Sequence, residues 1–92
     1  NLNESARKFF CDLLTREFYL TDRIKATNSQ LLEAIPTATS KRSIQRWLRS
    51  IKDEDLIGIR NIKIGPERFR RELSLSDKGK RVQKIIRNSQ IN

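Results

Sequence analysis

The segment SKRSIQRWLRSIKDEDLI, residues 40–57, has the pattern of a helix with an apolar face and an opposite polar face. Ser40 is a favourable N-cap residue, and apolar side chains follow it at helical spacing. They lie within about 60° of Ile44 on a helical wheel, and they are Ile44, Trp47, Leu48 and Ile51. We therefore predict a helix over residues 41–54 that packs one face on a core.

The other face of this helix is polar and basic. Its side chains lie between about 100° and 200° from Ile44, and they are Arg42, Gln45, Arg46 and Arg49. In a major groove, arginine can form two hydrogen bonds with guanine, and glutamine can do the same with adenine. We predict that these four residues contact DNA bases, foremost Gln45 and Arg49. The alternative for the arginines is a solvated face without a partner.

The start of the same helix carries small polar and basic side chains beside free backbone amides. These amides and the helix dipole favour a phosphate group. We expect Ser40, Lys41 and Ser43 to contact DNA phosphates, which would position the helix without reading sequence.

The residues that follow predict a β-hairpin over residues 56–75. The first strand is rich in isoleucine, Gly65-Pro66 is a turn signal, and the second strand alternates between two faces. The alternation slips between Ile59 and Ile62, which predicts a bulge or early fraying there. We expect Trp47 and Phe69 in the core, and Arg71 only partly exposed because it shares a face with Leu73.

Basic residues surround the turn of this hairpin. They could lie along a neighbouring minor groove or its phosphates. The predicted contacts are Lys63, Arg68 and Arg70, and Arg71 is a further candidate. The alternative is a charged edge strand that only prevents aggregation.

Two further helices are predicted before residue 40. Asn3 can cap a helix that runs to about Tyr19, whose apolar side chains cover an arc of roughly 180° and imply a second apolar contact. Residues 20–26 resemble a short extended link. Thr27 and Gln30 have the capping-box spacing of a short second helix, which should end at Ile35 because Pro36 cannot continue it.

Ser76 and Asp77 begin a predicted last helix over residues 77–88. We expect a homodimer in which its apolar stripe packs on the wide face of the partner's first helix. A two-fold dimer would read inverted half-sites about one DNA turn apart. The expected interface comprises Phe9, Phe10, Leu13, Leu14, Phe18, Val82, Ile85 and Ile86.

The composition suits one small folded domain with a polyanionic partner. Of 92 residues, 36% are hydrophobic and 34% are charged, and 20 basic against 11 acidic side chains give a net charge of +9. Residues 1–39 are neutral, whereas residues 40–71 hold ten basic and four acidic side chains. The excess charge therefore begins where the predicted base-reading helix begins.

Several classes of function are not expected from this composition. With no histidine and a single cysteine, Cys11, we expect no metal site, no internal disulfide and no cofactor. No glycine-rich phosphate loop, acid pair in a recognisable motif or nucleophile with an evident base is present, so we do not expect an enzyme. No apolar run approaches a membrane span and no leader opens the chain. We expect a protein of a reducing cytoplasm, associated with a nucleoid or plasmid.

Two segments resemble the winged-helix regulators of the MarR and PadR type: residues 43–57, SIQRWLRSIKDEDLI, and residues 73–80, LSLSDKGK. In that family a leucine-isoleucine pair leads from the recognition helix into the wing, as in Leu56-Ile57. The second wing strand ends in a leucine, a serine or threonine, an acid and Lys-Gly, as in residues 75–79. The resemblance covers residues 4–88 and implies a single winged helix-turn-helix domain, mainly α with a small β-hairpin.

One position departs from the family, which usually has a glycine where Asp55 stands. The turn must then be made by a non-glycine residue, and aspartate tolerates this better than most.

The compact basic chain is also similar to winged-helix proteins that coat partition sites on archaeal plasmids. The resemblance implies sequence-specific binding to double-stranded DNA, as a transcriptional regulator or as a plasmid partition protein in DNA segregation that can spread along DNA. The alternatives are a winged helix used for protein contact and an RNA-binding module.

Overall fold

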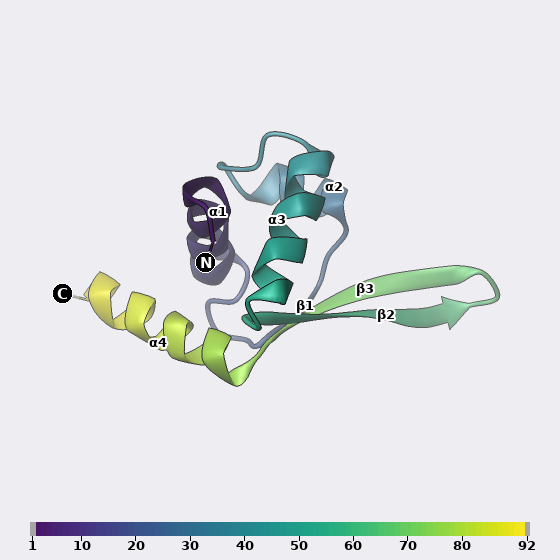
Figure 1. Cartoon of the computed structure of the whole chain (residues 1–92). Helices are drawn as coiled ribbons and strands as arrows, with labels where there is room; N and C mark the ends of the chain where they lie inside the picture. The colour runs from purple at the N-terminus through teal and green to yellow at the C-terminus, as the bar shows by residue number, and fades with distance from the viewer. Residues whose placement is uncertain (1, 92) are drawn as a thin grey trace.

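The structure is a computed structural model that describes residues 2–91, with all their side chains except those of Arg68, Phe69, Gln90 and Ile91. Within this range the chain forms four helices and a three-stranded antiparallel sheet (Figure 1). In chain order the elements are α1 (Glu4–Arg16), β1 (Arg23–Lys25), α2 (Asn28–Ala34), α3 (Lys41–Asp53), β2 (Ile57–Gly65), β3 (Arg68–Leu75) and α4 (Asp77–Ile91). This is a winged helix-turn-helix, so the predicted fold class is confirmed.

The first three helices have their N-caps at the predicted residues. Asn3 Oδ1 accepts the N–H of Ala6 at 2.8 Å. Thr27 and Gln30 form the reciprocal capping box, with N···O distances of 3.1 and 2.9 Å. Ser40 Oγ accepts the N–H of Ser43 at 3.1 Å. Each cap satisfies a backbone amide that the helix leaves unpaired, which stabilises a helix by about 1 kcal/mol.

The sheet has the strand order β1-β3-β2, with both pairs antiparallel. Residues 20–26 are therefore more than the expected link, because Arg23–Lys25 pairs with β3 as an edge strand. The predicted bulge between Ile59 and Ile62 is wrong, since the register shifts between Lys63 and Gly65. The outer part of the hairpin projects from the helices (Figure 1), so alternation of polarity there no longer reports which way a side chain points.

The core lies between α1, α2, α3 and the base of the sheet. Phe9, Leu13, Phe18 and Ile44 are fully buried, and the rings of Phe9 and Trp47 pack with centroids 5.2 Å apart. The wide apolar face of α1 has two neighbours in the same chain, α3 and α4. The second apolar contact expected for this helix is therefore provided by α4.

This arrangement corrects the expected dimer surface. The side chains of α1 and its C-terminal extension that we expected against a partner are buried in the chain's own core, which leaves them no exposed surface. They are Phe9, Phe10, Leu13, Leu14 and Phe18, none more than 3% exposed. Val82 and Ile86 are partly buried against the same core, and Ile85 is 65% exposed.

The start of α4 is joined to the end of α3. Asp55 adopts φ 60°, so the non-glycine turn expected at this position is confirmed. Ser76 donates its backbone N–H to Leu56 O at 3.1 Å and its hydroxyl to Asp55 O. Lys78 Nζ donates to Glu54 O at 3.0 Å. The two segments that carry the family resemblance are thus bonded to each other.

Candidate nucleic-acid interface

Helix α3 has one buried face and one exposed, basic face. Ile44, Leu48 and Ile51 are at most 1% exposed, and Trp47 is 8% exposed. The side chains on the other side are all exposed: Arg42, Gln45, Arg46, Arg49 and Lys52. The predicted two-sided helix is therefore confirmed, while base contact by its outer face stays a prediction.

The register of the hairpin decides which side chains share a face with α3. We call β2, β3 and their turn the wing. Residues directly opposite each other in an antiparallel pair point to the same side, and sides alternate along each strand. Ile59 pairs with Leu73, Asn61 with Arg71, and Lys63 with Phe69. Because Leu73 is buried, the inner face of the wing carries Ile59, Asn61, Lys63 and Arg71.

The outer face of the wing carries the remaining positions. Arg60 pairs with Glu72 and Ile62 with Arg70. Arg70 and Lys63, both predicted wing contacts, are exposed but lie on opposite faces. The side chain of Arg68, the third predicted contact, lies outside the described residues.

A groove of about 650 Å³ lies between α3 and the inner face of the wing. All four predicted base contacts line it, and five of its nine lining residues carry a positive charge. The lining residues are Arg42, Gln45, Arg46, Leu48, Arg49, Lys52, Ile59, Asn61 and Arg71. None of them is acidic, so the groove suits an anionic partner.

The cations of the groove take part in none of the ion pairs between described side chains. The ion pairs between described side chains are Lys8–Glu4, Arg60–Glu72 and Lys80–Asp22, and none of these residues lines the groove.

Arg71 is the most enclosed cation of the groove. Its Nε donates to Ala26 O at 3.1 Å, and its Nη2 is buried without a hydrogen-bond partner among the described residues. Burial lowers the pKa of Arg71 from its ordinary value, but a guanidinium stays charged at neutral pH. The expected partial exposure of Arg71 is confirmed.

The start of α3 carries the three predicted phosphate contacts. Ser40 Oγ caps the helix by accepting the backbone N–H of Ser43, and it also donates to Ser43 Oγ at 3.0 Å. Lys41 is exposed beside them. Phosphate contact by these residues stays a prediction.

Two polar groove residues were missed by the sequence-based prediction of DNA contacts: Lys52 and Asn61. Lys52 follows Arg49 by three residues, a spacing that places side chains side by side on a helix and could have identified it. Asn61 depends on the strand register, which the apolar pattern placed wrongly. The same register puts Arg71, a further candidate for a wing contact, opposite Asn61 on the side of the hairpin that lines the groove.

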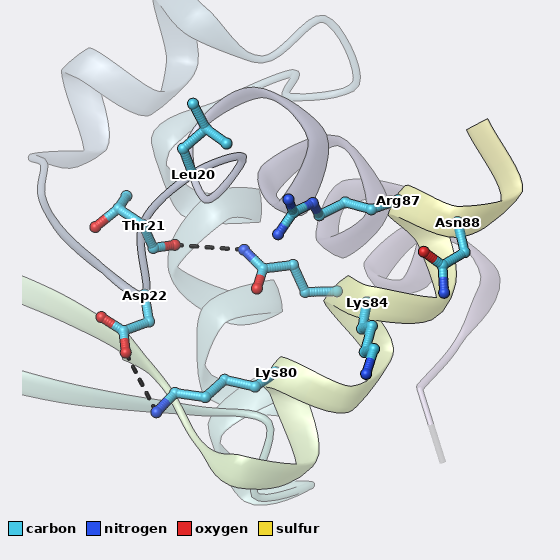
Figure 2. Close-up of a pocket in the computed structure, with 8 residues that line it drawn as sticks. Leu20, Thr21, Asp22, Lys80, Lys84, Arg87 and Asn88 are labelled. Carbon is cyan, nitrogen blue, oxygen red and sulfur yellow. Dashed lines mark hydrogen bonds and ion pairs between the residues drawn. The ribbon is translucent and has the colours of Figure 1, made fainter. Parts of the chain in front are cut away.

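A second hollow lies between α4 and residues 20–22, and Figure 2 shows its side chains. Lys80 Nζ lies 3.2 Å from Asp22 Oδ2, and Gln83 Nε2 donates to Phe18 O and, at 3.4 Å, to Thr21 O. These bonds hold α4 against the segment that leads into β1. No residue of α3 or the wing lines this hollow, so it is separate from the basic groove.

Two further properties concern the described part of the chain as a whole. No group of three or more His, Cys, Asp or Glu side chains lies close enough to hold a metal ion within residues 2–91. Over the same range, every helix is too short or too polar to cross a membrane.

The fold is similar to that of a solved structure, BpsR from Bordetella bronchiseptica, a protein whose DNA binding is regulated by 6-hydroxynicotinic acid. The TM-score is 0.63 at 12% sequence identity, and the match covers 92% of this chain and 56% of BpsR. This chain thus spans about half of BpsR, and at this identity the similarity shows the fold alone. No family model and no curated protein sequence matches the chain.

Proposed function

We propose that the chain binds double-stranded DNA in a sequence-specific manner, with α3 in a major groove and the wing on the adjacent minor groove or its phosphates. The observation that carries this proposal is the basic groove, which joins three exposed arginines and a glutamine of α3 to the inner face of the wing. The fold similarity to BpsR, whose DNA binding is regulated, supports the same reading.

The side chains divide into two roles under this proposal. Arg42, Gln45, Arg46 and Arg49 contact base edges, where arginine and glutamine read guanine and adenine. The phosphate backbone is contacted at the start of α3 by Ser40, Lys41 and Ser43, which position the protein. The adjacent minor groove or its phosphates are contacted by the wing residues Lys63, Arg68 and Arg70.

The test begins by selecting bound sites from random duplexes. Gln45→Ala and Arg49→Ala should weaken binding to the selected site by about tenfold or more while leaving random duplexes little affected, because a good base contact contributes about 1–3 kcal/mol of discrimination. Arg70→Ala should weaken both duplexes equally. Arg16→Ala, an exposed substitution on α1, is the matched control for charge.

Two results would count against the proposal. Equal losses on selected and random DNA from every substitution would reduce it to nonspecific coating. The absence of duplex binding at low salt would reject it and favour a winged helix used for protein contact.

We further propose that the biological role is transcriptional regulation or binding of a plasmid partition site. The two roles differ in how the protein occupies long DNA. In footprints at rising protein concentration, protection confined to one operator supports regulation, and protection that spreads supports partition.

We propose that the protein acts as a homodimer through α4. Ile85 is 65% exposed beside the partly buried Val82 and Ile86. Sedimentation should show a dimer that Ile85→Asp dissociates. Ile64→Asp is the matched control, because Ile64 is 53% exposed on the wing and its substitution should leave the dimer intact. A monomeric wild-type protein on and off DNA would contradict this proposal.

A further inference from the structure

We propose that Arg71 binds a phosphate of the DNA backbone in the groove between α3 and the wing. This inference rests on the proposed function and adds to it a residue and the chemical group that the residue binds. Three observations support it: the place of the groove, the way in which the Arg71 side chain is held, and the lack of a counter-charge.

The groove lies where a DNA backbone must pass. A major groove and the minor groove next to it are separated by one sugar-phosphate backbone. A protein that puts α3 into the first and the wing onto the second therefore lays this backbone across the groove between them. Arg71 lines that groove on its wing side, opposite Asn61 in the strand register.

The guanidinium of Arg71 is held in place before DNA arrives. Its Nε donates to Ala26 O at 3.1 Å, which ties β3 to the residue just before the cap of α2. Nε and Nη2 lie along the same edge of a guanidinium, so the other terminal nitrogen points away from Ala26. A long side chain that is already fixed loses less conformational entropy on binding than a free one.

Arg71 also has no acidic side chain paired with it among the described residues, unlike Arg60 on the same hairpin. Arg60 belongs to the adjacent residue pair, on the outer face of the wing, and its Nη2 lies 2.9 Å from Glu72 Oε1. None of the ion pairs between described side chains includes Arg71, although Nη2 is buried. A buried charge without a partner is unfavourable, and a phosphate in the groove would supply the missing negative charge.

The contrast between these two arginines gives a matched experiment. The affinity for a selected duplex and a random duplex is measured against salt concentration for the wild type, Arg71→Gln and Arg60→Gln. Both variants lose one positive charge from the same hairpin, so a general electrostatic effect would change both equally.

Arg71→Gln should lose about tenfold in affinity for both duplexes, because one charge-assisted hydrogen bond is removed. Its plot of log affinity against log salt should be shallower by about 0.9, the contribution of one phosphate contact. Arg60→Gln should keep the wild-type slope. Arg71→Lys, which keeps the charge, should restore most of the slope.

Thermal melting of each variant separates this role from a purely structural one. A lower melting temperature and lower affinity of Arg71→Gln with an unchanged slope would overturn the proposal and leave Arg71 as a link between β3 and Ala26. Equal slope changes in Arg71→Gln and Arg60→Gln would also overturn it. In both cases the wild type still binds DNA and the proposed function stands, whereas a wild type that binds neither duplex rejects both.

A second measurement needs no DNA. Inorganic phosphate should raise the melting temperature of the wild type above its value in chloride at equal ionic strength, since an anion that binds only the folded state stabilises it. This increase should be smaller in Arg71→Gln and unchanged in Arg60→Gln. An equal increase in all three proteins would count against a site at Arg71.

Discussion

Asp55 makes the turn between α3 and β2 with a positive φ of 60°. The left-handed region is unfavourable for side chains with a Cβ and is open to glycine. Asp55→Gly should therefore raise the free energy of unfolding by up to about 1 kcal/mol, and Asp55→Val should lower it by about 1–2 kcal/mol. Urea denaturation measures both effects. A loss of stability in Asp55→Gly would show that the carboxylate matters more than the backbone strain.

Gly79 lies where α4 passes the end of α3. A Cβ at this position would lie 2.1 Å from Leu56 O, a backbone atom that cannot turn aside. Gly79→Ala should lower the free energy of unfolding by about 2–3 kcal/mol or more, as expected for overpacking against rigid neighbours. Lys80→Ala, its exposed neighbour, is the control and should change stability by less than about 1 kcal/mol. Equal effects of the two substitutions in denaturant unfolding would contradict this reading.

At the scale of single residues, the sequence predicted what depends on neighbours along the chain. The caps at Asn3, Thr27 and Ser40 each bond to an amide three residues away, so a local pattern was sufficient. The hydrogen bond from Arg71 to Ala26 spans 45 residues of sequence. It depends on the pairing of β1 with β3, which no local pattern specifies.

Helix α3 has a buried face that should contribute to stability and an exposed face that should contribute to DNA binding. Leu48→Ala on its buried face should lower the free energy of unfolding by about 2–5 kcal/mol, because it leaves a cavity in the core. Arg46→Ala on its exposed face should change stability by less than about 0.5 kcal/mol and weaken DNA binding. Unfolding curves and duplex titrations of the same two variants check this. A large stability loss in Arg46→Ala would mean that its side chain packs rather than reads DNA.

Among the elements, α3 was predicted well because its periodicity is long, whereas β1 was missed because it is short. The thirteen residues of α3 carry four buried apolar side chains on one face, and the helix runs over Lys41–Asp53 where about 41–54 was predicted. The three residues of β1 have only Ile24 to indicate a strand. The wing beyond Ile59 has little core beneath it, so its bulge could not be located from the apolar pattern.

At the scale of the whole molecule, the candidate site was predicted in part. The four predicted base contacts converge on one groove because a helical wheel fixes their directions. The side chains of α1 that were expected at a dimer interface are buried within the chain, where α1 contacts both α3 and α4, and α4 lies at the opposite end of the sequence. The sequence of one helix does not specify which other element will pack on its apolar face.

Charge should dominate how the whole molecule binds DNA. If about five backbone contacts form, the affinity should fall roughly 500-fold between 50 and 200 mM salt, from a slope of about −0.9 per phosphate. Titration of one duplex at several salt concentrations measures this slope. A double Lys8→Ala and Arg16→Ala variant on α1 should keep it, although it lowers the net charge by two. A slope near zero would contradict the proposed backbone contacts.

The joint between residues 54–56 and residues 76–79 has a mechanical consequence. Helix α4 is fixed at its first turn by Ser76, Lys78 and Gly79, and its other end projects beyond the helical body (Figure 1). Lys80 and Gln83 also bond to the segment 18–22 that leads into β1. The first half of α4 is therefore a brace between this segment and the corner where α3 meets the wing, and α4 cannot turn about that corner without breaking these bonds.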